Sequence, residues 1–340
     1  MAVLASNVPT LIDIVQGLAP DGSQLHVAEV LKQTNPILED MTWMEGNLLT
    51  GHKDSVRTSL PEGSWRSLNA GVPITKGSTT PIEETCALLE DYSQVDAEIA
   101  KISGNVEAYR LKEGRAHIQG NSHKMARTLM YGNTAAGDGF TGFGNRFNNM
   151  NAANDQKAGQ ILDCGGTGTK LRSIYLIGWS HDTVTGIYPK NTVGGLQHED
   201  VTTPGAGTDS MVLRDGAGNP YQGYMDHWVW RCGLMVKDYR YVVRAANIDV
   251  DALVKNKATG ADIEDIMTQM VEMIEGLEGV RAAFYAPREL TSMLRRQMNN
   301  TKGTFLSWDE AGGKKVMNFG EVPVRRTDAL KVNESRVISA

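Results

Sequence analysis

Residues 48–80 place the strongest constraint on how this chain can fold. Val56 alternates with polar neighbours, Pro61-Glu62-Gly63 is typical of a turn, and no helical period follows. The pattern predicts a two-stranded ribbon, which is marginally stable when it stands alone. Trp65, together with Val56 and Leu60, needs an apolar surface that such a ribbon does not supply. Two interpretations follow: the ribbon lies on its own domain, or it projects and lies on a neighbouring subunit.

The glycine content indicates a chain with long connecting segments. The chain has 36 glycines in 340 residues, above the usual share of about 7%, while proline stands at 11. The glycines have no collagen-like period, so collagen and low-complexity disorder are excluded, and the excess predicts many turns and extended segments. The length predicts about two domains.

Charge and cysteine content exclude further classes. The net charge is −6, with 34 basic and 40 acidic residues, so the basic excess of a sequence-specific DNA-binding protein is missing. The three widely spaced cysteines, Cys86, Cys164 and Cys232, indicate reduced, packed thiols of an intracellular protein. The sequence shows no signal peptide and no apolar run of the ~18 residues that a membrane span needs.

The rest of the chain mixes helix and strand without strict alternation, which favours an α+β fold over a doubly wound sheet. Residues 96–131 predict a helix that, at ~1.5 Å per residue, is longer than most helices of globular proteins and acts as a beam. The clearest amphipathic helix spans 263–277, where apolar residues repeat at three-and-four spacing. The other predicted elements are a helix at 287–298 and strands at 174–177, 183–188, 224–234, 239–248, 280–285 and 322–324.

Two glycine-rich segments imitate nucleotide-binding motifs. Gly137–Gly142 matches GxGxxG, but that fingerprint needs a strand before it and a helix after it, and here a helix precedes it. The segment Cys164–Lys170 lacks the Gly-Lys-Ser/Thr that a phosphate-binding loop requires, because Leu171 follows Lys170. Both are interpreted as turns, and no cofactor is predicted.

Two further segments contain residue types that are found in catalytic or metal sites. Gly178–Asp182 contains Ser180 and His181, but adjacent strand residues point to opposite faces, so these two cannot form a relay with each other. A partner from elsewhere, such as His227, stays open, and with it a serine hydrolase that uses Ser180. His198-Glu199-Asp200 lacks a second ligand pair at a recognisable spacing, so no metal site is predicted.

Several segments are informative through their order, although each is weak alone. They are Gln33–Asp40, Glu45–Asn47, Val56–Thr58, Trp65-Arg66, Leu129–Asn133, Asp138–Gly142, Ile187–Lys190, Gly195–Asp200 and Tyr239–Arg244. With a short arm, a projecting ribbon and a beam helix, this order resembles the major capsid proteins of tailed double-stranded-DNA bacteriophages. Within that class it is most similar to the short-tailed branch, and the resemblance covers nearly the whole chain.

The resemblance implies an α+β Hong Kong 97-like capsid fold with named parts. They are an N-terminal arm (1–47), an E-loop region (48–95), a peripheral domain (96–250) with its spine helix (106–131), an axial domain (251–316) and a closing strand segment (317–340). In many relatives the strands that resemble 172–190 and 226–248 come near the C-terminus. Here they precede the axial-type helices, which suggests a permuted order of elements.

The same resemblance implies a non-enzymatic function. We expect a structural subunit that self-assembles into hexamers and pentamers of an icosahedral shell around phage double-stranded DNA, without sequence-specific binding and without a membrane. The expected interface residues are Val56, Arg57, Leu60, Trp65 and Arg66. A cellular encapsulin-like nanocompartment shell, which packages an enzyme, is the alternative with the same fold.

Further partners are expected from the resemblance. The arm begins within ten residues of Met1, so the family's long N-terminal scaffolding segment is missing and a separate scaffolding protein is expected. A portal and a cement or decoration protein complete the expected partners. The expected location is the virion capsid, assembled in the cytoplasm of the host bacterium.

Overall fold

The computed structural model describes residues 35–151, 156–202, 210–254, 256–258, 260–301, 306–311, 314–330 and 333–338. Most of the predicted arm, residues 1–34, lies outside the described residues. The described chain divides into two compact units. Unit 1 holds residues 88–125, 193–202 and 210–231, and unit 2 holds the described residues of 35–87, 126–192 and 232–338.

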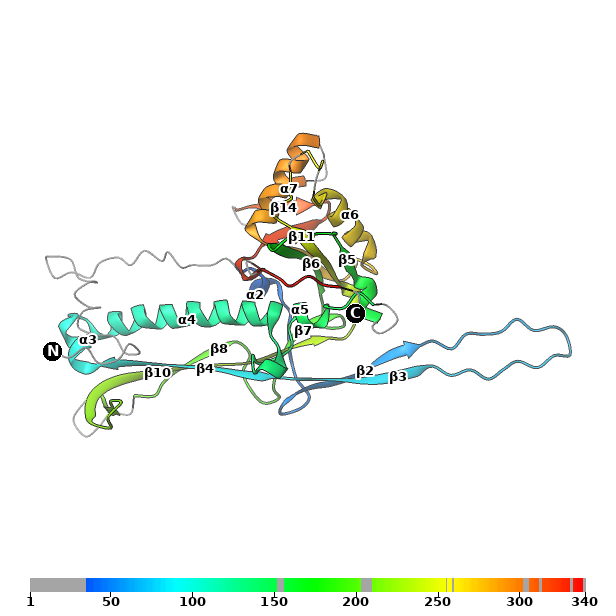
Figure 1. Cartoon of the computed structure of the whole chain (residues 1–340). Coiled ribbons are helices and arrows are strands. Elements are labelled where there is room, and N and C mark those ends of the chain that lie inside the picture. Colours follow the sequence, from blue (N-terminus) through cyan, green and yellow to red (C-terminus); the bar gives the residue numbers. More distant parts are fainter. Residues whose placement is uncertain are drawn as a thin grey trace. The chain divides into compact units, whose positions relative to one another are not determined.

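Unit 1 is a small antiparallel sheet covered by one long helix. Strand β10 (Pro220–Val236) pairs with β8 (Leu196–Asp200) and β9 (Met211–Arg214), and β4 (Ala87–Asp96) also pairs with β10. Helix α3 (Ala97–Ile102) is capped by the Asp96 carboxylate, which accepts from the Glu98 N–H. Gly104, with φ of 83°, then separates α3 from α4 (Val106–Tyr131). Helix α4 runs along β4, β8 and β10 in Figure 1.

Helix α4 has the bounds predicted for the spine helix, 106–131, and its contacts explain a glycine inside it. Trp228 of β10 is buried and stacks between His117 of α4, at 4.9 Å between ring centroids, and His198 of β8, at 5.2 Å. A Cβ atom at Gly114 would lie 3.3 Å from the Trp228 ring, so this helical glycine makes room for the indole. Its helix-propensity cost of about 1 kcal/mol is therefore offset by packing.

Unit 2 is built around a mixed sheet with the order β13, β14, β15, β12, β6 and β7. Strand β6 is buried at every position, pairs antiparallel with β12 on one side and with β11 on the other, and holds the sheet together. The strands are β5 (Ile161–Asp163), β6 (Leu171–Trp179), β7 (Val184–Tyr188), β11 (Val242–Asp249), β12 (Arg281–Ala286), β13 (Leu306–Ala311), β14 (Lys314–Phe319) and β15 (Val322–Arg326).

Two amphipathic helices close the core of unit 2 against this sheet. Helix α6 (Ile263–Met273) and helix α7 (Arg288–Thr301) lie beside β11 and β14 in Figure 1. Their apolar faces join one buried cluster with the sheet, including Met267 from α6, Leu294 from α7 and Phe284 from β12. This burial confirms the amphipathic helix that the three-and-four spacing predicted near 263–277, although α6 ends at Met273.

Short elements complete unit 2. Strand β1 (Trp43–Glu45) pairs parallel with β7, and the ribbon strands β2 (Gly51–Ser59) and β3 (Ser78–Thr85) form a separate two-stranded sheet. The remaining helices are α2 (Ile37–Asp40), α5 (Phe143–Arg146) and the 3₁₀ turns η1 (Thr134–Ala136), η2 (Gln156–Gln160), η3 (Tyr239–Tyr241) and η4 (Asp328–Leu330).

The sequence-based domain boundary at residue 250 does not separate the two units. Strands β6, β7 and β11 were predicted within a peripheral domain, whereas the structure places them with α6 and α7 in unit 2. The physical reason is the antiparallel register of β6 with both β11 and β12, which ties 171–179 to 281–286 in one sheet. The permuted order of elements stays an expectation from the resemblance.

Candidate assembly surface

The base of the β2–β3 ribbon is fixed to unit 2 by close backbone packing and by an ion pair. A Cβ atom at Gly51 would lie 2.0 Å from the Glu84 carbonyl oxygen, so only glycine fits where the strands meet. Arg146 of α5 holds the Glu84 carboxylate with both terminal nitrogens, and its Nη2 also donates to the Leu234 carbonyl at 3.2 Å. Such bidentate pairs are directional and strong, which fixes the direction in which the ribbon leaves the body.

A second ion pair fixes strand β2 a few residues beyond the base of the ribbon. Lys237 Nζ lies 2.7 Å from Asp54 Oδ2. The hydrogen bond from Lys237 lowers the pKa of the Asp54 carboxyl below its ordinary value, with a further contribution from the Ser55 N–H. The Lys237 side chain is mostly buried, whereas Asp54 is about a third exposed, so the pair lies at the margin of the body.

The distal half of the ribbon has no packing of its own. Pairing ends at Ser59 with Ser78, and the connecting segment 60–77 extends far beyond the last pair in Figure 1. Every residue of 60–77 is exposed. The large apolar side chains there are exposed by 72% at Leu60, 105% at Trp65, 91% at Leu68, 50% at Val72 and 100% at Ile74. We call residues 60–77 the ribbon tip.

The structure places the predicted interface residues on this ribbon. Leu60, Trp65 and Arg66 lie in the tip, while Val56 and Arg57 belong to β2, Val56 half-buried and Arg57 exposed. Arg66 donates to the Ala70 carbonyl at 3.2 Å within the tip. Neither arginine forms an ion pair with a described residue, and so their charges are available to another molecule.

Sequence reasoning missed part of this surface. Val72 and Ile74 add two apolar side chains on the returning arm of the tip. Their alternation at i and i+2 is a strand-like signal that was available in the sequence, but Pro73 between them obscured it. With them, the tip carries apolar side chains on both of its arms.

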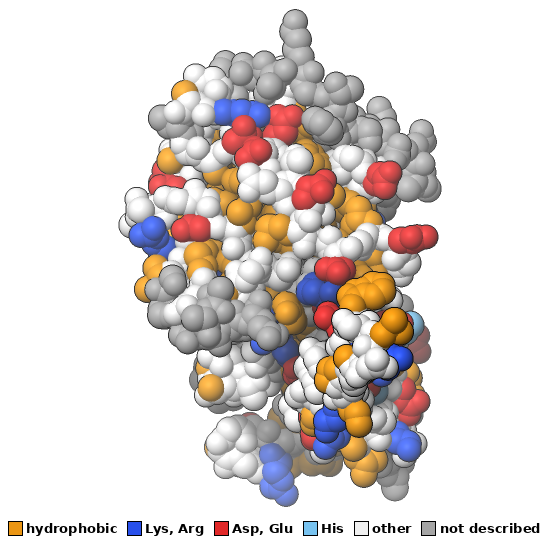
Figure 2. Space-filling model, turned by 90° about the vertical axis from the view of Figure 1, so that its right-hand side faces the viewer, with side chains coloured by type: hydrophobic (Ala, Val, Ile, Leu, Met, Phe, Trp, Pro, Cys, Tyr) orange, Lys and Arg blue, Asp and Glu red, His pale blue; other side chains and the backbone are white. Residues whose placement is uncertain are grey.

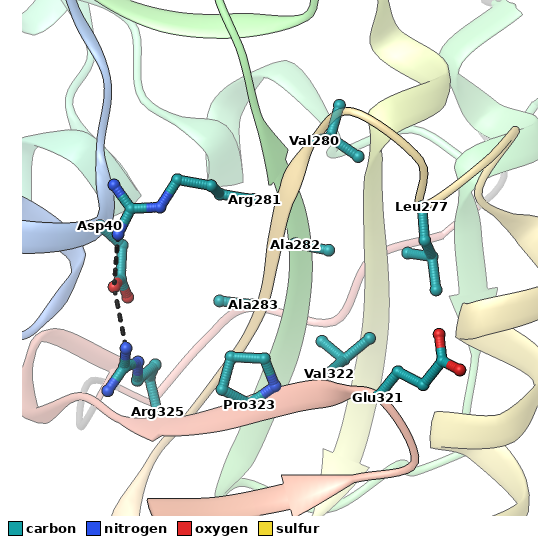
Figure 3. Close-up of a pocket in the computed structure, with 10 residues that line it drawn as sticks. All are labelled: Asp40, Leu277, Val280, Arg281, Ala282, Ala283, Glu321, Val322, Pro323 and Arg325. Carbon is teal, nitrogen blue, oxygen red and sulfur yellow. Dashed lines mark hydrogen bonds and ion pairs between the residues drawn. The ribbon is translucent and has the colours of Figure 1, made fainter. Parts of the chain in front are cut away.

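Unit 2 contains a groove of about 300 Å³ (Figure 3). Its floor is made of small and apolar residues, and Arg281 and Arg325 both point toward Asp40 at one end. Asp40 accepts hydrogen bonds from Tyr285 Oη at 3.0 Å and from Arg325 Nη2 at 3.1 Å. The lining residues are Asp40, Leu277, Val280, Arg281, Ala282, Ala283, Glu321, Val322, Pro323 and Arg325.

This groove is explained by structural packing. Tyr285 also accepts a hydrogen bond from Trp179 Nε1 at 2.9 Å, so the buried Asp40 closes a chain of hydrogen bonds through the sheet. Burial, with Asp40 close by, raises the pKa of Tyr285 well above its ordinary value and keeps the phenol protonated. The lining contains no serine, cysteine or histidine, and its Asp40 carboxylate is held by Tyr285 and Arg325.

The residues that the sequence offered as a catalytic serine and histidine have structural roles. Ser180, His181 and Asp182 form the turn between β6 and β7, where the Ser180 N–H donates to Val184 O at 3.2 Å. Within the part of the chain that the structure describes, the Ser180 hydroxyl makes no hydrogen bond with a histidine. His227, the partner left open, lies in unit 1 and stacks on Tyr92 at 4.1 Å. These positions give no support to the hydrolase alternative.

The glycine loops and the acidic cluster likewise have local roles. Gly142 follows α4, and a Cβ there would lie 2.5 Å from the Thr128 carbonyl oxygen. Gly166 donates its N–H to the Asn247 carbonyl at 2.9 Å, as a turn residue does. His198 and Asp200 face Asp226 and Arg110 of unit 1, and no group of three potential metal ligands occurs among the described residues.

The cysteines show the properties of packed thiols. All three are free, and burial raises the pKa of Cys86 to about 11 and the pKa of Cys164 and Cys232 to about 12. Their thiols therefore stay protonated near neutral pH and are poor nucleophiles. In the described part of the chain, no helix combines the length and hydropathy needed to cross a membrane.

Comparison with known proteins identifies this combination of fold and projecting ribbon. The chain resembles the solved capsid of bacteriophage epsilon15, with 29% identity, a TM-score of 0.75 and full coverage of both chains. It also resembles the capsid of bacteriophage JBD30, with 15% identity and a TM-score of 0.53, over 97% of this chain and all of the other. The holo-SrpI encapsulin of Synechococcus elongatus matches with 11% identity and a TM-score of 0.44, over 71% of this chain and 96% of the other. No curated protein matches the sequence.

The fold and the solved relatives define a structural shell protein of the Hong Kong 97-like class, a tailed-phage major capsid protein. Residues 19–338 match the family "Major capsid protein GP7". The chain belongs to that family. The α+β class and the identification drawn from the order of segments are thereby confirmed, and the chain is a component of the virion capsid.

Proposed function

We propose that this chain forms the hexamers and pentamers of an icosahedral shell that encloses phage double-stranded DNA, with the β2–β3 ribbon as a clamp between subunits. One observation carries the proposal: the ribbon is fixed at its base and leaves its apolar tip, with Trp65 and Ile74, in solvent. An isolated subunit gains nothing from exposing these side chains, whereas burial of a large apolar side chain contributes about 1.5–3 kcal/mol. A second copy of the chain supplies the missing surface.

The proposal includes the partners that the resemblance implied. A separate scaffolding protein, a portal and a cement or decoration protein would act with the shell, and assembly would take place in the host cytoplasm. The net charge of −6 suits a shell that encloses DNA without sequence-specific binding, because phosphate neutralisation requires a basic surface. Arg57 and Arg66, which have no ion pair with a described residue, would pair with acidic groups on the neighbouring copy.

Removing the tip tests the clamp. Replacing residues 60–77 with Asn-Gly joins the paired residues Ser59 and Ser78 through a two-residue turn that hairpins favour. We expect a folded subunit with an unchanged thermal midpoint that forms no shells under conditions in which the unaltered chain does. Electron microscopy and sedimentation velocity measure the shells, and circular dichroism measures the fold.

A point variant refines the same test. Trp65→Ala should reduce the yield of shells strongly, whereas Ser67→Ala, in the same exposed tip, should leave it unchanged. Normal shells from the chain without residues 60–77 would show that the ribbon is not the clamp. Failure of the unaltered chain to form shells with its scaffolding protein would contradict the proposed function itself.

A further inference from the structure

Helix α6 and the turn that follows it carry only negative charge. Residues 262–278 contain six acidic residues and no basic ones. The inward face of α6 is apolar, so the charges lie on the other side of the helix. Three of the acids are compensated locally: Asp262 and Glu264 by Lys257, and Glu275 by Arg240. The other three, Asp265, Glu272 and Glu278, are exposed and have no ion pair with a described residue.

Helix α7 carries the opposite charge on its outer side. It contains Arg288, Arg295 and Arg296 against the single acid Glu289, and all four side chains are exposed. Its inner side is buried through Leu290, Leu294 and Met298. Arg288 and Arg296 form no ion pair with any residue whose side chain is described. We call the two surfaces the acidic α6 face and the basic α7 face.

The two charged faces are held rigidly beside each other in one body. Gln297 of α7 is completely buried and accepts the Ile263 N–H at 3.0 Å, where α6 begins. Its amide nitrogen donates to Val254 O and Ala261 O, both at 3.1 Å. No ion pair joins Asp265 or Glu272 of α6 to Arg288 or Arg296 of α7, although the helices are neighbours. The opposite charges therefore remain available outside the subunit.

The acidic side is visible on the molecular surface. Figure 2 looks at the side of the molecule on which α6 lies in Figure 1, and its upper part is the α6 and α7 body of unit 2. On that part, red Asp and Glu side chains predominate over blue Lys and Arg side chains.

We propose that the acidic α6 face of one copy docks on the basic α7 face of the next copy, head to tail, around a ring. This inference rests on the proposed shell function and names the contact that closes its capsomers. Two acidic faces or two basic faces repel, whereas α6 against α7 is complementary. In the rings of the proposed shell, each copy then presents its α6 face to one neighbour and its α7 face to the other. The partner is therefore a second copy of this chain.

Charge reversal on one face tests the contact. Glu272→Lys with Glu278→Lys would place positive charge against the basic α7 face, and Arg288→Glu with Arg296→Glu would place acid against acid. Each double variant should lower the initial rate of shell assembly about tenfold or more, because like charges meet at every subunit contact. Light scattering follows the rate, and thermal unfolding of the subunit should be unchanged, since these side chains make no described ion pair.

Combining both reversals gives the decisive measurement. A chain with all four substitutions has its faces exchanged in sign, and so α6 and α7 attract again and shells should return. Mixing the α6-reversed and α7-reversed chains should also restore contacts in rings with an even number of subunits, where the two kinds alternate. A ring of five cannot alternate, so hexamers should return more completely than closed shells.

The control uses exposed charges of unit 2 outside both faces. Asp182→Arg with Lys190→Glu should leave the rate of assembly unchanged. Normal assembly of both single-face variants, or no recovery in the four-substitution chain while its thermal midpoint is normal, would overturn the α6–α7 contact. In either case, shells from the unaltered chain would leave the proposed function standing, so the two failures are distinguishable.

Discussion

The β2–β3 ribbon and the β6–β12 strand pair are both antiparallel pairs of unit 2, but they bury their side chains to opposite degrees. Trp179 of β6 is 1% exposed and donates its indole N–H to Tyr285 of β12. Trp65 of the ribbon tip is fully exposed. One pair is stabilised by the subunit's own core, whereas the other is only anchored by it. The difference supports the proposal that part of the apolar surface encoded in this sequence is kept for contacts that form on assembly.

The largest expected effect compares the two tryptophans directly. Trp179→Ala should lower the free energy of unfolding of the subunit by about 3–5 kcal/mol, because it leaves a cavity and removes a buried hydrogen bond. Trp65→Ala should change it by less than about 0.5 kcal/mol, as for exposed side chains generally. Chemical denaturation of the unassembled chain measures both, and equal losses would remove the distinction between core and tip.

An intermediate effect is expected at the base of the ribbon. Arg146→Ala removes both hydrogen bonds to the mostly buried Glu84 carboxylate and should lower the free energy of unfolding by about 2 kcal/mol. Arg57→Ala, on the exposed part of β2, is the control and should have almost no effect. Hydrogen exchange should show faster exchange at 78–85 only in the Arg146 variant. Unchanged protection there would mean that the ribbon is held by backbone pairing alone.

The smallest expected effect concerns pH. The pKa of Asp54 is lowered by Lys237, so the folded state binds its proton less readily than the unfolded state. The ion pair therefore stabilises the fold above the ordinary pKa of about 3.8, and this contribution is lost as the pH falls through the lowered value. Asp54 is partly exposed, so the contribution is at most about 1 kcal/mol.

Urea titrations at several pH values test this sign. Asp54→Asn should be less stable than the unaltered chain at pH 6, and the difference should shrink toward pH 2. Glu83→Gln, on the exposed neighbouring strand, provides the comparison, because its pair with Lys53 is half-exposed on both sides. A difference between the Asp54 variant and the unaltered chain that grew in acid would contradict the assigned linkage.

Sequence patterns predicted those helices and strands whose signal lies within a single segment. The apolar face of α6 and the alternating strand at Tyr224–Leu234 follow from spacing within one segment, and both are found in the structure. The helix predicted over 96–131 is divided into α3 and α4, with Gly104 between them. The absence of helical period predicted the ribbon, but the turn expected at Pro61-Glu62-Gly63 was wrong: the chain turns at Leu68-Asn69, where Asn69 has a φ of 70°.

Long-range pairing was not predictable in the same way. Strand β6 pairs with β11 and with β12, which are distant in sequence, and nothing within 171–179 specifies those partners. The charged faces of α6 and α7 were also missed. Their residues are visible in the sequence, but only the fold shows that Gln297 holds the two helices together.

The central claim is that another copy of the chain covers the ribbon tip. A cryo-electron microscopy reconstruction of the assembled shell, at a resolution that traces residues 60–77, tests it most directly. The account predicts that Trp65, Leu68 and Ile74 are buried against a neighbouring subunit, with Arg57 or Arg66 within ion-pair distance of its carboxylates. A tip that remains in solvent in the assembled shell, with Trp65 as exposed as in the single chain, would contradict it.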